Sequence, residues 1–379
     1  MKRIIAYSTA IILLLVSGCN KPLGTTVPEQ FDRYIFFSQG VDTKAGLIEN
    51  TGDLDGKEFA VLGYKYDINS TWDAFKATNK GPNVFVTGDN KYETVECDAS
   101  GDGSYEPLQG WSNSKKYTFF AYYPIDETDE PKVELVNANG GPYTGGSPYL
   151  KYSLDVADLK SSMVDLMTGD CNHLSTTGGK THTAPCQKDL YWKSSTDNNI
   201  ANGEVTFRFE HRLSSLGVKA KNGTTGSIKI TGAAMQINGI QNETITIPLE
   251  GGTPQTTGPE AAYNAEISLD VPSGGESISN TTNHQELSDK LIFIPQTGPL
   301  SIRMIIEYER SANGYQSFTT TATIPADQNG QAQFLTVASL AEGTKYMIPL
   351  NFTESSVTVS GNINGEKWAN SHEITDTFN

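Results

Sequence analysis

Short runs of alternating hydrophobic and polar residues, separated by turns, are the main pattern of the chain. Residues 205–209 (VTFRF) alternate strictly, and residues 213–220 continue the pattern. Successive side chains of a strand point to opposite faces, so this period predicts antiparallel strands with one buried face. The same pattern, with Gly or Pro in nearly every gap, predicts further strands at residues 228–230, 245–249, 267–271, 291–294, 302–308, 319–324, 346–352 and 357–359.

The chain before residue 203 combines hydrophobic strands with a long loop-rich stretch. The strands are predicted at residues 59–66, 83–87, 92–97 and 116–123, whereas the Gly- and Pro-rich residues 131–202 show no regular period. The change of pattern predicts a boundary between an N-terminal domain, 45–202, and a C-terminal domain, 203–379. A length of 379 residues is enough for two domains. Strands at this spacing, without a helical period, predict an all-β fold built from β-sandwiches.

The first residues of the chain have the pattern of an export signal. Lys2 and Arg3 precede an apolar run, residues 11–16, that is too short to cross the ~30 Å hydrocarbon core of a bilayer. This order is typical of a secretory signal peptide. Small residues stand directly before Cys19, which is the bacterial lipobox pattern. We predict that residues 1–18 are removed and that Cys19 carries a lipid; the alternative is an ordinary signal peptide with an incidental cysteine.

Residues 19–44 combine a polar tether with one strongly hydrophobic segment. Four consecutive aromatic or β-branched residues predict a buried strand, namely Tyr34, Ile35, Phe36 and Phe37. Lys44 follows in a polar stretch and precedes two small residues. A trypsin-like protease that cuts after Lys44 would remove both the lipid and this strand. The loss of the strand would open a groove only if the strand belongs to the folded sheet.

Composition and charge favour a β-rich protein and oppose binding to nucleic acid or anionic lipid. The chain contains 36 Gly, 17 Tyr and 15 Phe, and only 19% of its residues are charged, which is typical of a β-rich chain with many turns. The formal net charge of −16 opposes binding to nucleic acid or to anionic lipid. No second apolar stretch approaches the length of a membrane span. The lipid on Cys19 is therefore the membrane anchor that we predict.

Two cysteines and two histidines lie close together in the loop-rich stretch: Cys171, His173, His182 and Cys186. Because the chain is predicted to be exported, we expect a disulfide between Cys171 and Cys186. Closing a loop of this size would contribute roughly 3 kcal/mol in the chain-entropy model. A zinc site made by all four residues and a pair of free thiols are the alternatives. Cys97 is then expected in the hydrophobic core.

Motifs for catalysis or metal binding are weak. The sequence contains no G-x-S-x-G, no H-E-x-x-H and no Gly-rich phosphate loop after a strand. Residues 98–103 begin like a calcium loop, but Gln109 stands where a bidentate Glu is needed, so a hairpin turn is predicted instead. His211 follows a predicted strand and is interpreted as a structural histidine rather than a general base. No cofactor is predicted, and we do not expect an enzyme.

Several short motifs together resemble the fimbrillin family of Bacteroidetes pili. They are T-K-A at residues 43–45, F-A-V-L-G-Y-K-Y at 59–66, V-D-L-M at 164–167, F-R-F-E-H-R-L-S-S-L-G-V at 207–218 and G-T-K-Y-M-I-P-L-N-F at 343–352, followed by Trp368. The resemblance implies two transthyretin-like β-sandwich domains in tandem. It also implies a lipoprotein precursor whose first strand is removed by an Arg/Lys-specific surface protease, with Lys44, or else Arg33, before the cut. A strand from another subunit then takes its place.

From the residues and the resemblance together we expect a structural subunit of a surface fimbria, a type V pilus, that supports adhesion. Its expected partners are other pilin subunits and, before processing, the outer membrane through the lipid. No nucleic acid is expected as a partner. The alternatives are a retained surface lipoprotein that binds a host glycan or protein, and the tip or anchor subunit of the pilus.

Overall fold

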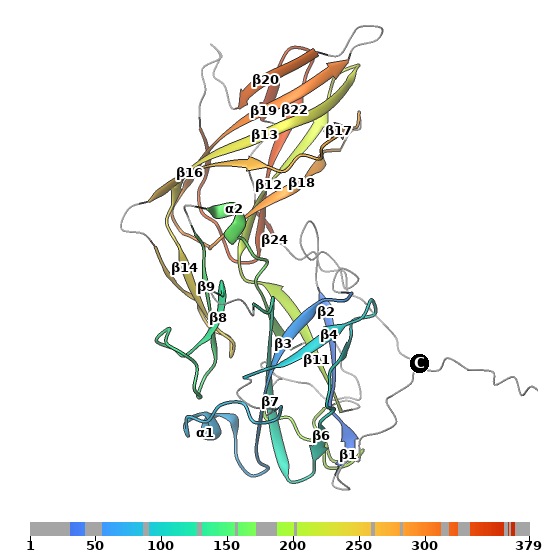
Figure 1. The fold of residues 1–379 in the computed structure, drawn as a ribbon, viewed down its shortest axis with the longest axis vertical. Coiled ribbons are helices and arrows are strands. Elements are labelled where there is room, and N and C mark those ends of the chain that lie inside the picture. The colour runs from blue at the N-terminus through green and yellow to red at the C-terminus, as the bar shows by residue number, and fades with distance from the viewer. Residues whose placement is uncertain are drawn as a thin grey trace, which may run out of the picture.

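The computed structural model describes residues 31–41, 55–85, 91–126, 131–155, 158–171, 188–200, 203–258, 262–280, 283–311, 318–324, 334–359, 363 and 365–367. Within these residues the protein consists mainly of strands in several sheets (Figure 1), with two short helices, α1 (Trp72–Lys76) and α2 (Leu159–Ser162). The all-β fold class is confirmed for this part of the chain. Neither helix is long and apolar enough to cross a membrane.

Seven strands close into a barrel, which lies in the lower part of Figure 1. Its order is β10 (Met167–Cys171), β11 (Glu204–His211), β2 (Phe36–Val41), β5 (Asp102–Ser104), β4 (Glu93–Cys97), β3 (Glu58–Asp67) and β7 (Lys115–Tyr123). β2 runs parallel to β11, and every other neighbouring pair is antiparallel. A further strand, β1 (Phe31–Tyr34), pairs with β6 (Gly110–Ser112). We call residues 31–211 the barrel half.

Alternate residues of the barrel strands meet in one hydrophobic cluster. β11 contributes Val205, Phe207 and Phe209 to it, which are the hydrophobic positions of the alternating run. In β3, Phe59 belongs to the same cluster, whereas its neighbour Ala60 belongs to a second cluster on the other face. The two-residue period therefore decides which side chains fill the barrel.

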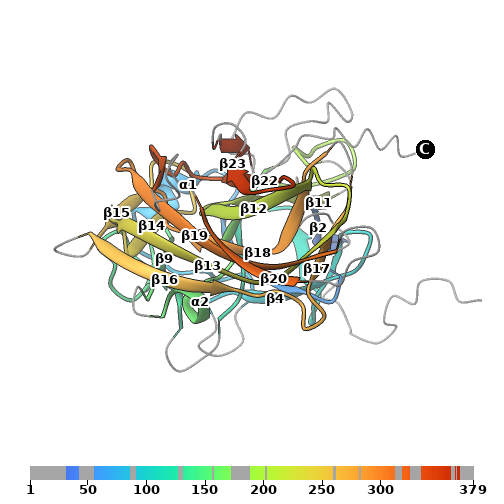
Figure 2. The same cartoon turned by 90° about the horizontal axis from the view of Figure 1, so that it is seen from above.

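The C-terminal half, residues 214–367, contains two sheets that Figure 2 shows from above. One has the order β18 (Gln285–Phe293), β12 (Ser214–Asn222), β22 (Thr344–Phe352) and β23 (Val357–Val359), with β24 (Gly365–Lys367) also paired to β22. The other has the order β16 (Tyr263–Leu269), β13 (Ser227–Ile240), β19 (Leu300–Ser311) and β20 (Phe318–Ile324), with β17 (Glu276–Ile278) on β13 and β21 (Leu335–Val337) on β19. Leu216 of β12 and Met235 of β13 belong to one hydrophobic cluster, so the two sheets share a core.

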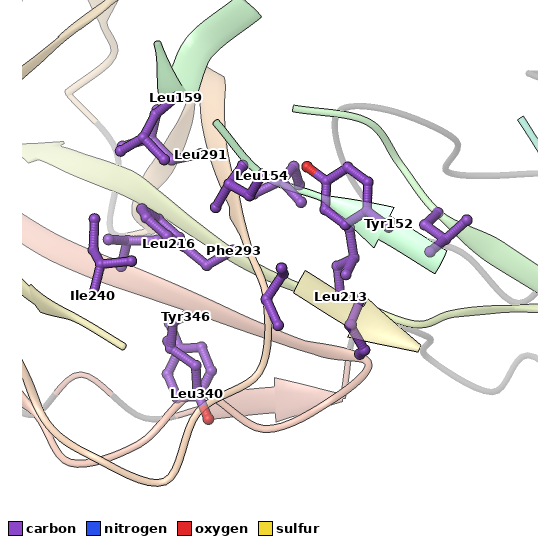
Figure 3. Close-up of a cluster of buried hydrophobic side chains, with 14 of the residues drawn as sticks. Tyr152, Leu154, Leu159, Leu213, Leu216, Ile240, Leu291, Phe293, Leu340 and Tyr346 are labelled. Carbon is purple, nitrogen blue, oxygen red and sulfur yellow. The ribbon is translucent and has the colours of Figure 1, made fainter. Parts of the chain in front are cut away.

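A four-stranded sheet joins the two halves. Its order is β15 (Gln255–Thr257), β14 (Thr244–Pro248), β9 (Tyr149–Ser153) and β8 (Val133–Val136). β9 of the barrel half pairs with β14 of the C-terminal half over five residue pairs. Next to this contact, Tyr152 and Leu154 belong to the same cluster as Leu213 and Leu216 (Figure 3). The halves therefore share a sheet and a hydrophobic core.

The stretch at residues 131–202 differs from the prediction of loops. It contains the strands β8, β9 and β10 and the helix α2, each of five residues or fewer. Elements this short, set between Gly- and Pro-rich turns, give too few positions for a period to be recognised. The main partner of β9 is also distant in sequence, because Leu150 lies opposite Ile247.

The strand predicted at residues 83–87 is not formed at its described residues, 83–85. Instead, the backbone N–H groups of Asn83 and Val84 both donate to the carbonyl oxygen of Gly63, at 2.9 and 3.2 Å. Phe85 is buried against the same position, and a Cβ atom at Gly63 would lie 2.6 Å from its ring. The apolar residues of this segment therefore pack against β3 without joining the sheet.

Candidate functional site

The predicted removable strand lies inside the barrel half. Ile35 and Phe37 are 0% and 2% exposed, whereas Tyr34 and Phe36 are half-buried. The segment consists of two strands, because β1 ends at Tyr34, Ile35 stands between, and β2 begins at Phe36. Burial at every second position places Ile35 and Phe37 on the inner face.

β2 closes the barrel between two strands that are distant in sequence. It pairs with β11 over six residue pairs, from Phe36 opposite Glu204 to Val41 opposite Phe209. On its other edge, Phe37 lies opposite Gly103 of β5. Without β2, the edges of β11 and β5 would lose these backbone partners, and unpaired backbone groups are costly when they are buried.

Phe37 occupies an aromatic pocket. Its ring centroid lies between 5.3 and 6.0 Å from those of four other rings, namely Phe85, Tyr105, Phe119 and Phe207. Aromatic pairs at this spacing contribute beyond the apolar area that they bury. The pocket also needs a glycine on β5, because a Cβ atom at Gly103 would lie 2.6 Å from Val95 and 3.1 Å from the carbonyl oxygen of Phe37.

Two hydrogen bonds fix the backbone of Ile35 where β1 passes into β2. Its N–H donates to the carbonyl oxygen of Gln109 at 2.8 Å. Its carbonyl oxygen accepts from the hydroxyl of Tyr105 at 2.9 Å. Burial raises the pKa of Tyr105, so this hydroxyl stays protonated and remains a donor. Both bonds serve a single residue, so they hold the backbone of the segment in place at this point.

Arg33, one of the two candidate cleavage residues, contacts Trp192 of the barrel's hydrophobic cluster. Its guanidinium carbon lies 5.2 Å from the ring centroid of Trp192, which is a cation–π contact. Trp192 belongs to the hydrophobic cluster that contains Ile35 and Phe37. Arg33 itself is exposed and stands within β1, whose residues pair with β6. The chain at Arg33 is thus already engaged as a strand.

A family model described as Fimbrillin-like matches residues 66–368 of the sequence. This match covers more than half of the chain. The chain belongs to the Fimbrillin-like family. The match begins at Tyr66 in β3, after β1 and β2.

Two known proteins show the extent of the similarity. The fimbrium subunit Fim1C of Phocaeicola vulgatus is 22% identical to this fimbrillin-like chain over 386 residues, covering 93% of each protein. The crystal structure of a fimbrial protein from Bacteroides vulgatus superposes with a TM-score of 0.54 and 22% identity. That comparison covers 89% of this chain and 100% of the other. At this identity the structural similarity shows a common fold.

Several predicted site residues lie outside the described residues: Cys19, Lys44, His173, His182 and Cys186. Cys171 is the last residue of β10, where it lies opposite Phe207. Its disulfide with Cys186 stays a prediction. The described part of the chain contains no group of three or more His, Cys, Asp or Glu residues placed to hold a metal ion. Cys97 is buried, as expected.

The segment at residues 98–103 forms the hairpin turn predicted in place of a calcium loop. The Oδ1 atom of Asp98 accepts from the backbone N–H groups of Ser100 and Asp102, at 2.8 and 3.0 Å. The flanking strands β4 and β5 pair directly, with Cys97 opposite Gly103. The carboxylate therefore stabilises the turn that places Gly103 against β2.

His211 is buried and paired with an acid that sequence reasoning did not assign to it. Its Nδ1 atom lies 2.7 Å from Oδ1 of Asp165, and both side chains are less than 5% exposed. Asp165 belongs to the V-D-L-M motif, which precedes and enters β10. The pair joins the last residue of β11 to the segment just before β10 in the interior, which agrees with a structural role for His211.

Glu250 is a further charged residue whose partners the sequence did not indicate. It follows β14 in the C-terminal half, and its Oε2 atom contacts Nζ of Lys76 at 2.8 Å and Nζ of Lys188 at 3.0 Å. Both lysines belong to the barrel half. Burial favours the neutral acid, but hydrogen bonds, foremost that from Lys76, outweigh it and lower the pKa of Glu250 from 4.5 to about 2. Glu250 therefore binds the two halves together as a carboxylate.

Proposed function

We propose that this fimbrillin-like chain is a structural subunit of a surface fimbria that assembles by donor-strand exchange and supports adhesion. In this proposal the precursor is exported as a lipoprotein anchored in the outer membrane through Cys19. A surface protease then removes the first strand, and a strand of another pilin subunit replaces it. The proposal includes two tandem transthyretin-like β-sandwich domains, as in the sequence-based expectation.

The observation that carries the proposal is the place of β2 between β11 and β5. An edge strand could leave a sheet and expose one edge. β2 is an inner member of a closed barrel, so its departure would expose two edges and an apolar trough at once. Both edges could be covered again by one incoming strand. This geometry favours strand replacement over simple loss of the strand.

The energy of the exposed trough favours assembly. Ile35 and Phe37 each contribute roughly 1.5–3 kcal/mol through burial of apolar surface. The same stabilisation is available to any strand that fills the trough with similar side chains. The intact precursor should therefore be monomeric, and the processed chain should polymerise.

The positions of β1 and β2 in the chain favour Lys44 over Arg33 as the cleavage residue. A cut after Lys44 would detach all of β1 and β2. A cut after Arg33 would leave Ile35 and Phe37 covalently attached to the rest of the chain. The trough would then stay filled. We therefore propose cleavage after Lys44, with Arg33 as the second candidate.

Limited trypsin treatment of the purified precursor tests the proposal. Size-exclusion chromatography should show oligomers, and intact-mass analysis should show a chain that begins at Ala45. A variant that carries Lys44→Ala and Arg33→Ala should remain monomeric under the same treatment. If the wild type loses residues 31–41 and stays monomeric, strand exchange is not its mode of assembly. A surface protein that keeps a lipidated Cys19 would indicate a retained lipoprotein or an anchor subunit.

A further inference from the structure

We propose that the site filled here by β1 and β2 selects the strand that binds in it. The selection uses three side chains at alternate positions of that strand: a cation, a branched aliphatic residue and an aromatic ring. Arg33, Ile35 and Phe37 present this pattern here. The partner is then an extended segment of another subunit with the pattern cation–x–aliphatic–x–aromatic. This inference rests on the proposed function, and it adds the chemistry by which the site distinguishes one strand from another.

The aromatic position is the most selective of the three. The four rings around Phe37 come from four separate segments: the residues after α1, the residues after β5, and the strands β7 and β11. They meet the Phe37 ring at interplanar angles from 20° to 78°. A flat ring can contact all four at once, whereas the rounder side chain of leucine would leave part of the pocket empty. Phe36 is half-buried and lies on the opposite face.

The aliphatic position sets the register. Ile35 is fully buried, and its backbone is held on both sides by Gln109 and Tyr105. A shift of one residue would exchange the inner and outer faces of the whole segment. It would bring Phe36 to the inner face and move Phe37 out of its pocket. The burial of the side chains at positions 35 and 37 therefore determines which residue of an incoming segment reaches the aromatic pocket, and the two backbone hydrogen bonds hold the segment there.

The cationic position covers the end of the site. Trp192 is 7% exposed, and the guanidinium of Arg33 lies over its ring. The aliphatic stem of Arg33 lies against the start of β11, since a Cβ atom at Gly203 would be 2.8 Å from Cδ of Arg33. Arg33 thus covers the ring of Trp192, while the charge of the guanidinium stays in water. This contact gives Arg33 a role in docking that is separate from cleavage.

Synthetic peptides of residues 31–41 test the selection. The acceptor is the trypsin-processed protein, kept below the concentration at which size-exclusion chromatography shows oligomers. Binding is measured by fluorescence anisotropy. Relative to the wild-type peptide, Phe37→Leu should bind about tenfold more weakly, because it loses several aromatic contacts. Arg33→Gln should bind about threefold more weakly. Phe36→Leu is the matched control and should change affinity less than about twofold. Equal losses for Phe37→Leu and Phe36→Leu would overturn the proposal.

A second measurement uses the intact chain and needs no cleavage. Hydrogen exchange of the β2 amides should be faster in full-length Phe37→Leu than in full-length Phe36→Leu, because only the first weakens the pocket. Indistinguishable exchange in the two variants would refute the selectivity of the pocket, whether or not the strand is ever released. If hydrogen exchange instead differs between the two variants while the processed protein never forms oligomers, the selectivity of the pocket is supported. The proposed assembly by strand exchange is then wrong.

Discussion

Replacing Glu250 by a glutamine should weaken the contact between the two halves in a pH-dependent way. A carboxyl whose pKa falls from 4.5 to about 2 on folding stabilises the folded state by roughly 3 kcal/mol at neutral pH. The folded pKa is depressed, so this contribution is complete above about pH 4.5 and is lost as the pH falls toward 2. The amide of the variant would carry no such titration. Glu250→Gln should therefore be less stable than the wild type at pH 7 and should approach it as the solution is acidified.

Urea unfolding followed by tryptophan fluorescence at a series of pH values between 7 and 3 measures this difference. Glu134→Gln is a matched control, because Glu134 also contacts a lysine, Lys151 at 3.2 Å, but its side chain is 41% exposed. An exposed ion pair of this kind contributes about 0.5 kcal/mol. If wild type and Glu250→Gln lose stability in parallel between pH 5 and pH 3, the two lysine contacts do not hold Glu250 as described.

Three further predictions concern the first strand and the predicted modifications. Gly103→Ala should destabilise the folded chain by about 1–3 kcal/mol in urea unfolding, because the new Cβ atom would lie 2.6 Å from Val95 of β4; a neutral result would mean that the side chain of Val95 can move aside without cost. Cys19→Ala should abolish metabolic labelling by a fatty acid, and equal labelling of both proteins would contradict the lipobox. Mass spectrometry of a non-reduced digest should recover Cys171 linked to Cys186, whereas stoichiometric zinc with both thiols reduced would favour the metal site.

Alternation of hydrophobic and polar residues was sufficient to locate most of the described strands after residue 203. The run at residues 205–209 became β11, and its hydrophobic positions are the buried ones, because burial of one face is what selects a two-residue period. The same reasoning missed β8 and β9, which are four and five residues long. Strands this short are fixed by their neighbours in the sheet, and a local pattern does not identify those neighbours.

The candidate site was predicted in part. The aromatic segment indicated a buried strand, but four consecutive apolar residues concealed that only Ile35 and Phe37 face inward. The parallel pairing of β2 with β11 had no local signal, because parallel partners are joined by long connections. Glu250 could not be found for the same reason, since Lys76 and Lys188 reach it only through the tertiary fold.

The pairing of β9 with β14 has a mechanical consequence. Figure 1 shows β14 running roughly along the long axis of the molecule. Antiparallel hydrogen bonds are perpendicular to their strands, so a force that pulls the two halves apart along this axis would load the β9–β14 contact in shear. All five residue pairs would then resist together, rather than opening one after another from an end. Under tension along this axis, the two halves of the subunit would stay joined and transmit the force from one end to the other.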